Sequence, residues 1–166
     1  MEQRALTTAE FDLFAGALDY PMFVVTTTDG VERSGCLVGF TTQTGIDPPR
    51  FLVCLSDKNH TLRVAEGADL LAVHLLAEDQ HDLAELFGGE TGDEVDKFAR
   101  CAWRPGPAGV PLLDACPHRI VGRILERRPL GDHVGFLLEP ILVDASGPEE
   151  ALTLQDAEDV DPGHTA

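Results

Sequence analysis

Hydrophobic positions follow a helical period near the start of the chain and again in its middle, and a strand-like pattern elsewhere. A capping-box pattern from Thr7 to Glu10 precedes apolar residues at helical spacing, which continue as far as Leu18. We therefore predict a first helix that ends before Tyr20-Pro21.

Strand-like segments follow this helix. Residues 22–28 are rich in β-branched side chains and end at the hairpin signal Asp29-Gly30. The returning strand is expected over residues 31–43. Two shorter apolar strands are expected at 51–56 and 70–76, with a helix from residue 61 to about residue 66 between them.

The middle of the chain is predicted to be helical. Asp79 can cap a helix that runs through Leu86 and stops at Gly88-Gly89. A second capping box begins at Thr91 and predicts another short helix before Phe98.

Strands return after Pro111 and continue to the end of the patterned part of the chain. They are expected at 119–128 and 133–143, with a turn at Gly131-Asp132 between them. Six or seven strands with helices only at the start and in the middle predict a mainly β fold. The expected architecture is a closed or nearly closed antiparallel barrel.

Length and composition fit one globular domain. The chain has 166 residues, of which 43% are hydrophobic, which is enough for a sizeable core. Residues 146–166 hold six acidic residues and no Lys or Arg. We therefore expect a domain over residues 1–145 and an acidic, flexible tail over 146–166.

The formal net charge of −17 argues against binding to nucleic acid or to an anionic membrane, because both need clustered Lys and Arg. A small ligand or a protein partner is expected instead. The start of the chain lacks the pattern of a secretory signal, and no later apolar run approaches membrane-spanning length. We therefore expect a cytoplasmic protein.

Neither the cysteines nor the histidines are spaced like metal ligands. The four cysteines include no C-x-x-C pair, which favours buried reduced thiols over a zinc site or disulfides. His60, His74 and His81 are not set four residues apart, so we predict no metal site. The sequence also lacks the usual phosphate-binding loops and the nucleophile elbow of serine hydrolases.

Polar residues gather at two neighbouring strand ends in the stretch GFTTQTGIDPPRFLVCLSDKNHT, residues 39–61. Neither face of the segment 40–45 is uniformly apolar, and Lys58, one of only two lysines, follows the next strand. One interpretation is a solvated strand edge, in which threonine is present for its β propensity. The other is a site where hydroxyls, backbone N–H groups and one cation hold a phosphate.

Five motifs in a fixed order resemble the flavin reductase-like proteins of the FMN-binding split-barrel fold. They are the stretch above, AVHLL, LAELFGGETGDEVDKF, GVPLL and GDHVGFLLEP, and the resemblance spans roughly residues 11–143. It implies a split antiparallel β-barrel of Greek-key type with a few short helices. It also implies a homodimer with flavin near the subunit interface, and reduction of FMN or FAD by NADH or NADPH. Many such proteins supply reduced flavin to a partner monooxygenase.

The resemblance also implies which residues form the site. The flavin ring and ribityl chain would lie along Phe40, Thr41, Thr42, Gln43 and Thr44. The ribityl chain and phosphate would be held by Lys58, Asn59 and Thr61, Phe98 of the pair Lys97-Phe98 would pack beside the flavin, and His133 of the triplet G-D-H would face the nicotinamide. Many relatives have serines where this chain has Gln43 and Gly45, so we expect Gln43 and backbone amides to make those ribityl contacts.

The expected function is therefore a flavin reductase, in which flavin accepts a hydride at N5 from C4 of the nicotinamide. The cofactors carry this chemistry, so few acid or base side chains are required. One alternative is a flavin-binding carrier or electron-transfer protein that does not oxidise NADH or NADPH efficiently. A further alternative on related barrels is the binding of haem or deazaflavin.

Overall fold

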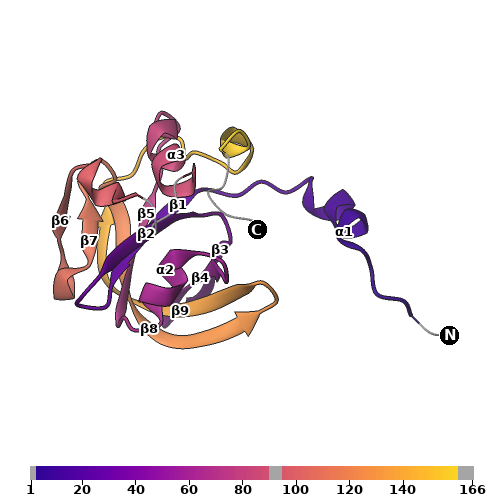
Figure 1. The fold of residues 1–166 in the computed structure, drawn as a ribbon, viewed down its shortest axis with the longest axis horizontal. Coiled ribbons are helices and arrows are strands. Elements are labelled where there is room, and N and C mark those ends of the chain that lie inside the picture. Colours follow the sequence, from indigo (N-terminus) through magenta and orange to yellow (C-terminus); the bar gives the residue numbers. More distant parts are fainter. Residues whose placement is uncertain (1–2, 90–94, 161–166) are drawn as a thin grey trace.

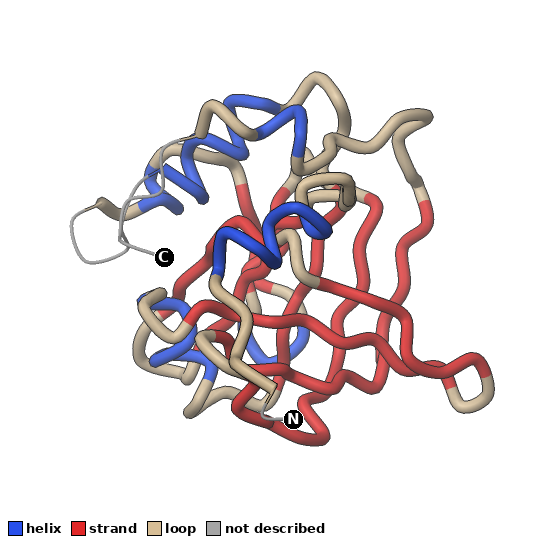
Figure 2. The backbone as a smooth tube through the Cα atoms, turned by 90° about the vertical axis from the view of Figure 1, so that its right-hand side faces the viewer, coloured by secondary structure: helices blue, strands red, loops and turns tan. Residues whose placement is uncertain are grey.

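The computed structural model describes residues 3–89 and 95–160, which form a strand-rich barrel with short helices around it (Figures 1 and 2). The helices are α1 (Thr8–Ala15), α2 (His60–Ala65) and α3 (His81–Gly89). Three 3-10 turns cover Lys97–Ala99, Pro107–Gly109 and Gln155–Ala157. The strands are β1 (Phe23–Thr28), β2 (Arg33–Val38), β3 (Thr41–Ile46), β4 (Pro49–Ser56), β5 (Leu70–Leu75), β6 (Trp103–Pro105), β7 (Pro111–Leu113), β8 (His118–Leu130) and β9 (His133–Ala145).

Seven of the described strands form one antiparallel sheet in the order β2-β1-β5-β8-β9-β4-β3. The sheet curls until β2 approaches β4, which leaves β3 as an open edge. This is a split antiparallel barrel, and the fold prediction is confirmed. The short pair β6-β7, which the sequence pattern did not predict, forms a second sheet beside the barrel.

The predicted strand over 31–43 is in fact two strands. β2 pairs with β1 as far as Val38, opposite Phe23, and β3 pairs with β4 from Thr41, opposite Val53. The chain changes partner at Gly39, where a Cβ atom would lie 3.1 Å from the sulfur of Met22. A single strand over 31–43 was wrong because the hydrophobic pattern cannot show where a strand changes its neighbour.

The first helix begins as predicted, because Thr7 and Glu10 form the complete capping box. It ends at Ala15, three residues before Leu18, and none of its eight described residues is buried. Phe11 and Phe14 remain 56% and 66% exposed. Figure 1 shows α1 standing away from the barrel at the end of an extended segment. Its apolar residues therefore have little packing from the rest of this chain.

The core has two main parts, one inside the barrel and one outside it. The barrel interior is filled by side chains such as Val53, Leu71 and Phe136, and Leu62 of α2 packs against them. The outer cluster lies between the sheet and α3. It includes Met22, Val24, Leu76, Ala84, Phe87, Phe98, Leu113, Cys116, Leu152 and Ala157.

The C-terminal segment, residues 146–160, differs from the flexible tail that its composition predicted. Thr153 and Ala151 form β-bridges with Pro21 and Ala77, and Leu152 is 1% exposed in the outer cluster. The average acidity of the segment concealed a few apolar residues that suffice to dock it. Residues 161–166, and the predicted capping box at Thr91, lie outside the described residues.

All four cysteines lie within the described ranges as free thiols, but only Cys36 and Cys116 are buried as predicted, whereas Cys54 and Cys101 are partly exposed. Burial raises the pKa of the Cys36 and Cys116 thiols to about 11, so both stay protonated near neutral pH. Within the ranges that the structure describes, no helix is long and apolar enough to cross a membrane.

Candidate functional site

Several of the predicted site residues meet where β4 ends beside the start of β9. Ser56 is paired with His133, and the amide N–H of Asp57 donates to the carbonyl of Asp132 at 2.9 Å. The carbonyl of Phe40 accepts a hydrogen bond from the N–H of Cys54 on β4 at 2.9 Å. Phe40, the residues after β4 and His133 are thus gathered from three distant parts of the chain.

An aromatic surface forms at this place. The rings of Phe40 and His133 lie 5.0 Å apart between centroids, and Tyr20 meets Phe40 edge-on at 5.9 Å. Phe40 is 48% exposed, so the surface is open to a planar ligand. Sequence reasoning missed Tyr20 at this site, although it is the only tyrosine in the chain and its position after the first helix was a weak signal.

The polar strand beside this surface is β3, which has an unusual environment. It is the edge of the sheet, and Thr42, Gln43 and Thr44 are all exposed, although adjacent residues in a strand face opposite sides. The side chains of Thr42 and Gln43 make local hydrogen bonds, to the carbonyls of Gln43 and Gly45. Their polar groups, and the edge of the strand itself, are accessible to a ligand.

The local backbone of this strand explains why residue 45 is glycine. The register between β3 and β4 shifts between Gln43 and Gly45, and a Cβ atom at residue 45 would lie 2.7 Å from the carbonyl oxygen of Pro48. A serine there would force the hairpin apart. The absence of serine at this position therefore follows from the local backbone.

Lys58, Asn59 and Thr61 follow β4 but face different surroundings. Lys58 is exposed. Asn59 caps α2, since its side-chain oxygen accepts from the N–H of Thr61 at 2.9 Å. Thr61 is 1% exposed, and its hydroxyl lies 2.9 Å from that of Ser34 inside the barrel. Of these three predicted ligands, Lys58 is the most open to solvent and Thr61 is enclosed.

The structure does not bring Phe98 to the Phe40–His133 surface. Phe98 is 6% exposed in the outer cluster, where its ring packs edge-on against Phe87 at 5.8 Å and Trp103 at 5.5 Å. Its neighbour Lys97 is buried as well, and the Nζ of Lys97 donates to the carbonyls of Phe87 and Gly35. In this chain Lys97, next to Phe98, therefore joins α3 to β2 through these two hydrogen bonds.

His133 is held by its neighbour in the turn. Nδ1 of His133 lies 2.7 Å from a carboxylate oxygen of Asp132, and its side chain is 23% exposed. This contact, followed by a smaller effect from the charge of Lys58, lowers the pKa of Asp132. An ionised carboxylate at Nδ1 favours the tautomer with the proton on that nitrogen. Nε2 is then the unprotonated nitrogen, which can accept a hydrogen bond.

The arrangement fits a flavin in three respects. An exposed aromatic ring can pack against a planar ring system, the groups of β3 can hydrogen-bond a polyhydroxyl chain, and Lys58 can approach a phosphate. The site is an open surface on a strand edge. A separate cavity of about 250 Å³ is lined mainly by apolar residues including Phe23, Phe51 and Ile120, and shares no lining residue with this surface.

Comparisons with known proteins identify the family of this chain. The model of the flavin reductase like domain matches residues 15–159. The FMN reductase (NADH) RutF of Stutzerimonas stutzeri is 34% identical over 131 residues, which are 77% of this chain and 74% of that protein. The 4-hydroxyphenylacetate 3-monooxygenase reductase component of Escherichia coli is 26% identical over 127 residues, or 75% of each protein.

A solved structure supports the fold. The NADH:FAD oxidoreductase SgcE6 of Streptomyces globisporus superimposes with a TM-score of 0.79, covering 91% of this chain and 92% of that chain. At 23% sequence identity this similarity concerns the architecture alone. Since the domain model covers most of the chain and a relative of comparable length exceeds 30% identity, the protein belongs to the flavin reductase-like family.

Proposed function

We propose that the protein is an NAD(P)H-dependent flavin reductase whose flavin lies along β3 and the Phe40–His133 surface. The observation that carries this proposal is the convergence of Phe40, the polar edge of β3, Lys58 and His133 in a member of this family. Bound flavin supplies the electron chemistry, because it takes a hydride from the nicotinamide, which is thereby oxidised. The relative named FMN reductase (NADH) favours FMN and NADH as the pair to test first.

The residues of the chain bind and orient the two cofactors. Phe40 offers a face or edge for ring contact, and Thr42, Gln43 and Thr44 offer donors and acceptors for the ribityl chain. Lys58 supplies the positive charge for the phosphate, in a chain whose formal net charge is −17. Holding the reacting rings in position is the main contribution of such a site to the rate.

His133 positions the nicotinamide. With Nδ1 held by Asp132, its Nε2 can hydrogen-bond the nicotinamide amide. The histidine does not have to exchange a proton for this role. Its effect should therefore be seen in nicotinamide binding and in the rate of flavin reduction.

A homodimer is part of the proposal, because apolar side chains on α1 and at the end of β3 are exposed among the described residues. Phe11, Leu13 and Phe14 on α1 are 56% to 85% exposed, and Ile46 at the end of β3 is 86% exposed. A second copy packed over β3 would bury an unpaired strand edge and enclose the flavin. Sedimentation that gave a monomer at micromolar concentration, with flavin still bound, would contradict this part of the proposal.

We also propose that the reduced flavin serves a partner monooxygenase and that the protein acts in the cytoplasm. The monooxygenase is suggested by the relative named as the reductase component of a 4-hydroxyphenylacetate 3-monooxygenase. A partner that takes up reduced flavin needs the flavin to leave this site.

The experiment that tests the activity is an anaerobic absorbance titration. The purified chain is mixed with FMN and then with NADH or NADPH, and the flavin bands are followed. Bleaching by either donor, at a rate well above that of free FMN, is the expected result. A yellow colour that persists with both donors would contradict the reductase and favour the flavin carrier.

A further inference from the structure

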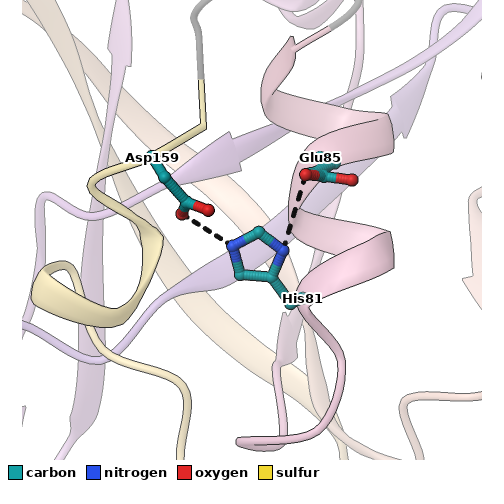
Figure 3. Close-up of side chains that lie close together, drawn as sticks. All are labelled: His81, Glu85 and Asp159. Carbon is teal, nitrogen blue, oxygen red and sulfur yellow. Dashed lines mark hydrogen bonds and ion pairs between the residues drawn. The ribbon is translucent and has the colours of Figure 1, made fainter.

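Away from the flavin site, the ring of His81 lies between two carboxylates from distant parts of the chain (Figure 3). His81 and Glu85 stand one turn apart on α3, and Asp159 comes from the C-terminal segment. Nε2 of His81 is 2.8 Å from Oδ1 of Asp159, and Nδ1 is 3.7 Å from Oε1 of Glu85. Neither contact belongs to the surface proposed to bind flavin.

Two carboxylates around one imidazole ring attract positive charge. A neutral imidazole has one N–H group and one bare nitrogen, so it can donate to only one of the two carboxylates. The other nitrogen would place its lone pair toward a carboxylate oxygen. A proton, a water molecule or a metal cation between the two atoms would relieve this repulsion.

The surroundings favour a cation as well. The whole chain has a formal charge of −17, so the site lies in a negative potential.

The ligand atoms are close enough for one ion. One nitrogen of His81 and one oxygen from each carboxylate lie within 4.8 Å of one another. The side chains of Glu85 and Asp159 are 59% and 70% exposed, so both can rotate to the shorter ligand distances of a bound metal, about 2.0–2.2 Å. A mixed nitrogen and oxygen set with room for water suits a borderline divalent cation.

We propose that His81, Glu85 and Asp159 form a binding site for a divalent transition-metal cation, with Zn²⁺ as the best match. This inference goes beyond the proposed reductase function and does not depend on it. The ion would complete its coordination with water.

The site would fasten the C-terminal segment to α3. Val160 packs against the outer cluster next to Asp159, and Leu152 and Ala157 of the same segment are buried there with Phe87. The ion would therefore join two elements that already share an apolar contact. Because α3 also packs on β2, the fastening would stabilise the covered side of the barrel.

Isothermal titration of the full-length chain, without an affinity tag, with Zn²⁺ tests the proposal. One saturable site per chain is expected. Glu85→Gln and Asp159→Asn keep side-chain size and remove a ligand charge, and each should weaken the affinity by roughly tenfold or more. Saturating Zn²⁺ should also raise the thermal midpoint of the parent by more than that of Asp159→Asn.

Glu32→Gln is the matched control, because Glu32 also pairs with a histidine, His60, at 2.5 Å, but offers no third ligand in the described residues. Its Zn²⁺ affinity should equal that of the parent. Co²⁺ in place of Zn²⁺ should give no thiolate charge-transfer band, since the proposed ligands are nitrogen and oxygen. Equal Zn²⁺ affinity in the parent and both ligand variants, a thiolate band, or no saturable binding up to about 1 mM would overturn the proposal.

Discussion

The two sides of the barrel differ in how completely the chain covers them. Beside β2, α3 and the C-terminal segment cover the sheet, and Phe87, Phe98 and Leu152 are almost fully enclosed. Beside β4, the edge strand β3 is exposed on both faces, and Phe40 and Ile46 are open to solvent. The side chains on the covered side pack against one another and stabilise the fold. The side chains on the open side remain accessible to a ligand or a second copy.

Two phenylalanines give the largest contrast between these sides. Phe87→Ala should lower the free energy of unfolding by about 3–5 kcal/mol, because it leaves a cavity in the outer cluster. Phe40→Ala should cost roughly 1 kcal/mol or less, since about half of that side chain is already exposed, but it should weaken FMN binding. Urea denaturation followed by FMN titration measures both effects. Equal losses of stability in the two variants would contradict the contrast.

A buried histidine on the covered side, His74, should also make the protein less stable in mild acid. His74 is buried, its Nδ1 donates to the carbonyl of Val24, and its Nε2 accepts from the N–H of Leu113. Burial lowers the pKa of His74 from 6.5 to about 4, so the unfolded chain binds this proton more readily between those pH values. The contribution of His74 is full above pH 6.5 and falls by roughly 3 kcal/mol as the pH drops to about 4.

Thermal unfolding of the parent and of His74→Gln checks this prediction between pH 7.5 and 4.5, a range that spans most of that window. The variant is expected to be less stable at neutral pH and to have a flatter pH dependence. Parallel pH profiles for the two proteins would show that His74 is not the group responsible.

On the open side, Lys58→Ala should weaken FMN binding without destabilising the fold. Losing one charged contact to a phosphate should cost about 1.5–3 kcal/mol, which corresponds to roughly ten- to a hundredfold in affinity. Arg123→Ala is the matched control, because Arg123 is an exposed cation on β8 and its loss changes the net charge equally. The same dissociation constant in all three proteins would remove Lys58 from the site.

The smallest expected effect is that of His133→Ala. The variant should bind FMN within a few fold of the parent but should show a higher Michaelis constant for NADH or slower flavin reduction. Stopped-flow reduction under anaerobic conditions separates these steps. If both donors reduce the flavin as fast in the variant as in the parent, the role proposed for His133 is wrong.

Much of the fold could be predicted because its signals are local. The capping box at Thr7, the hairpin at Asp29-Gly30 and the long pair β8-β9 all follow from short-range patterns. The change of partner at Gly39 and the docking of Leu152 depend on contacts with residues distant in sequence. Such contacts leave no periodic trace, so the pattern of hydrophobic residues could not show them.

The sequence motifs predicted some of the residues that form the candidate site, but not all of them. The motifs named Phe40 and His133, which the fold does bring together, but they also named Phe98, which this chain packs into its outer cluster. Tyr20 and the group around His81 were not predicted, because their interactions are with residues distant in sequence. Tyr20 packs against Phe40, and His81 contacts Asp159. Asp159 lies 78 residues after His81, and no spacing rule connects the two.

The central claim is that flavin binds on the open side of the barrel. Hydrogen–deuterium exchange of the chain with and without FMN tests it most directly, since bound ligand protects the backbone it covers. We expect added protection in β3, in residues 56–59 and around His133, with little change in α3 and at Lys97–Ala99. Protection confined to α3 and Lys97–Ala99, with β3 unchanged, would contradict it.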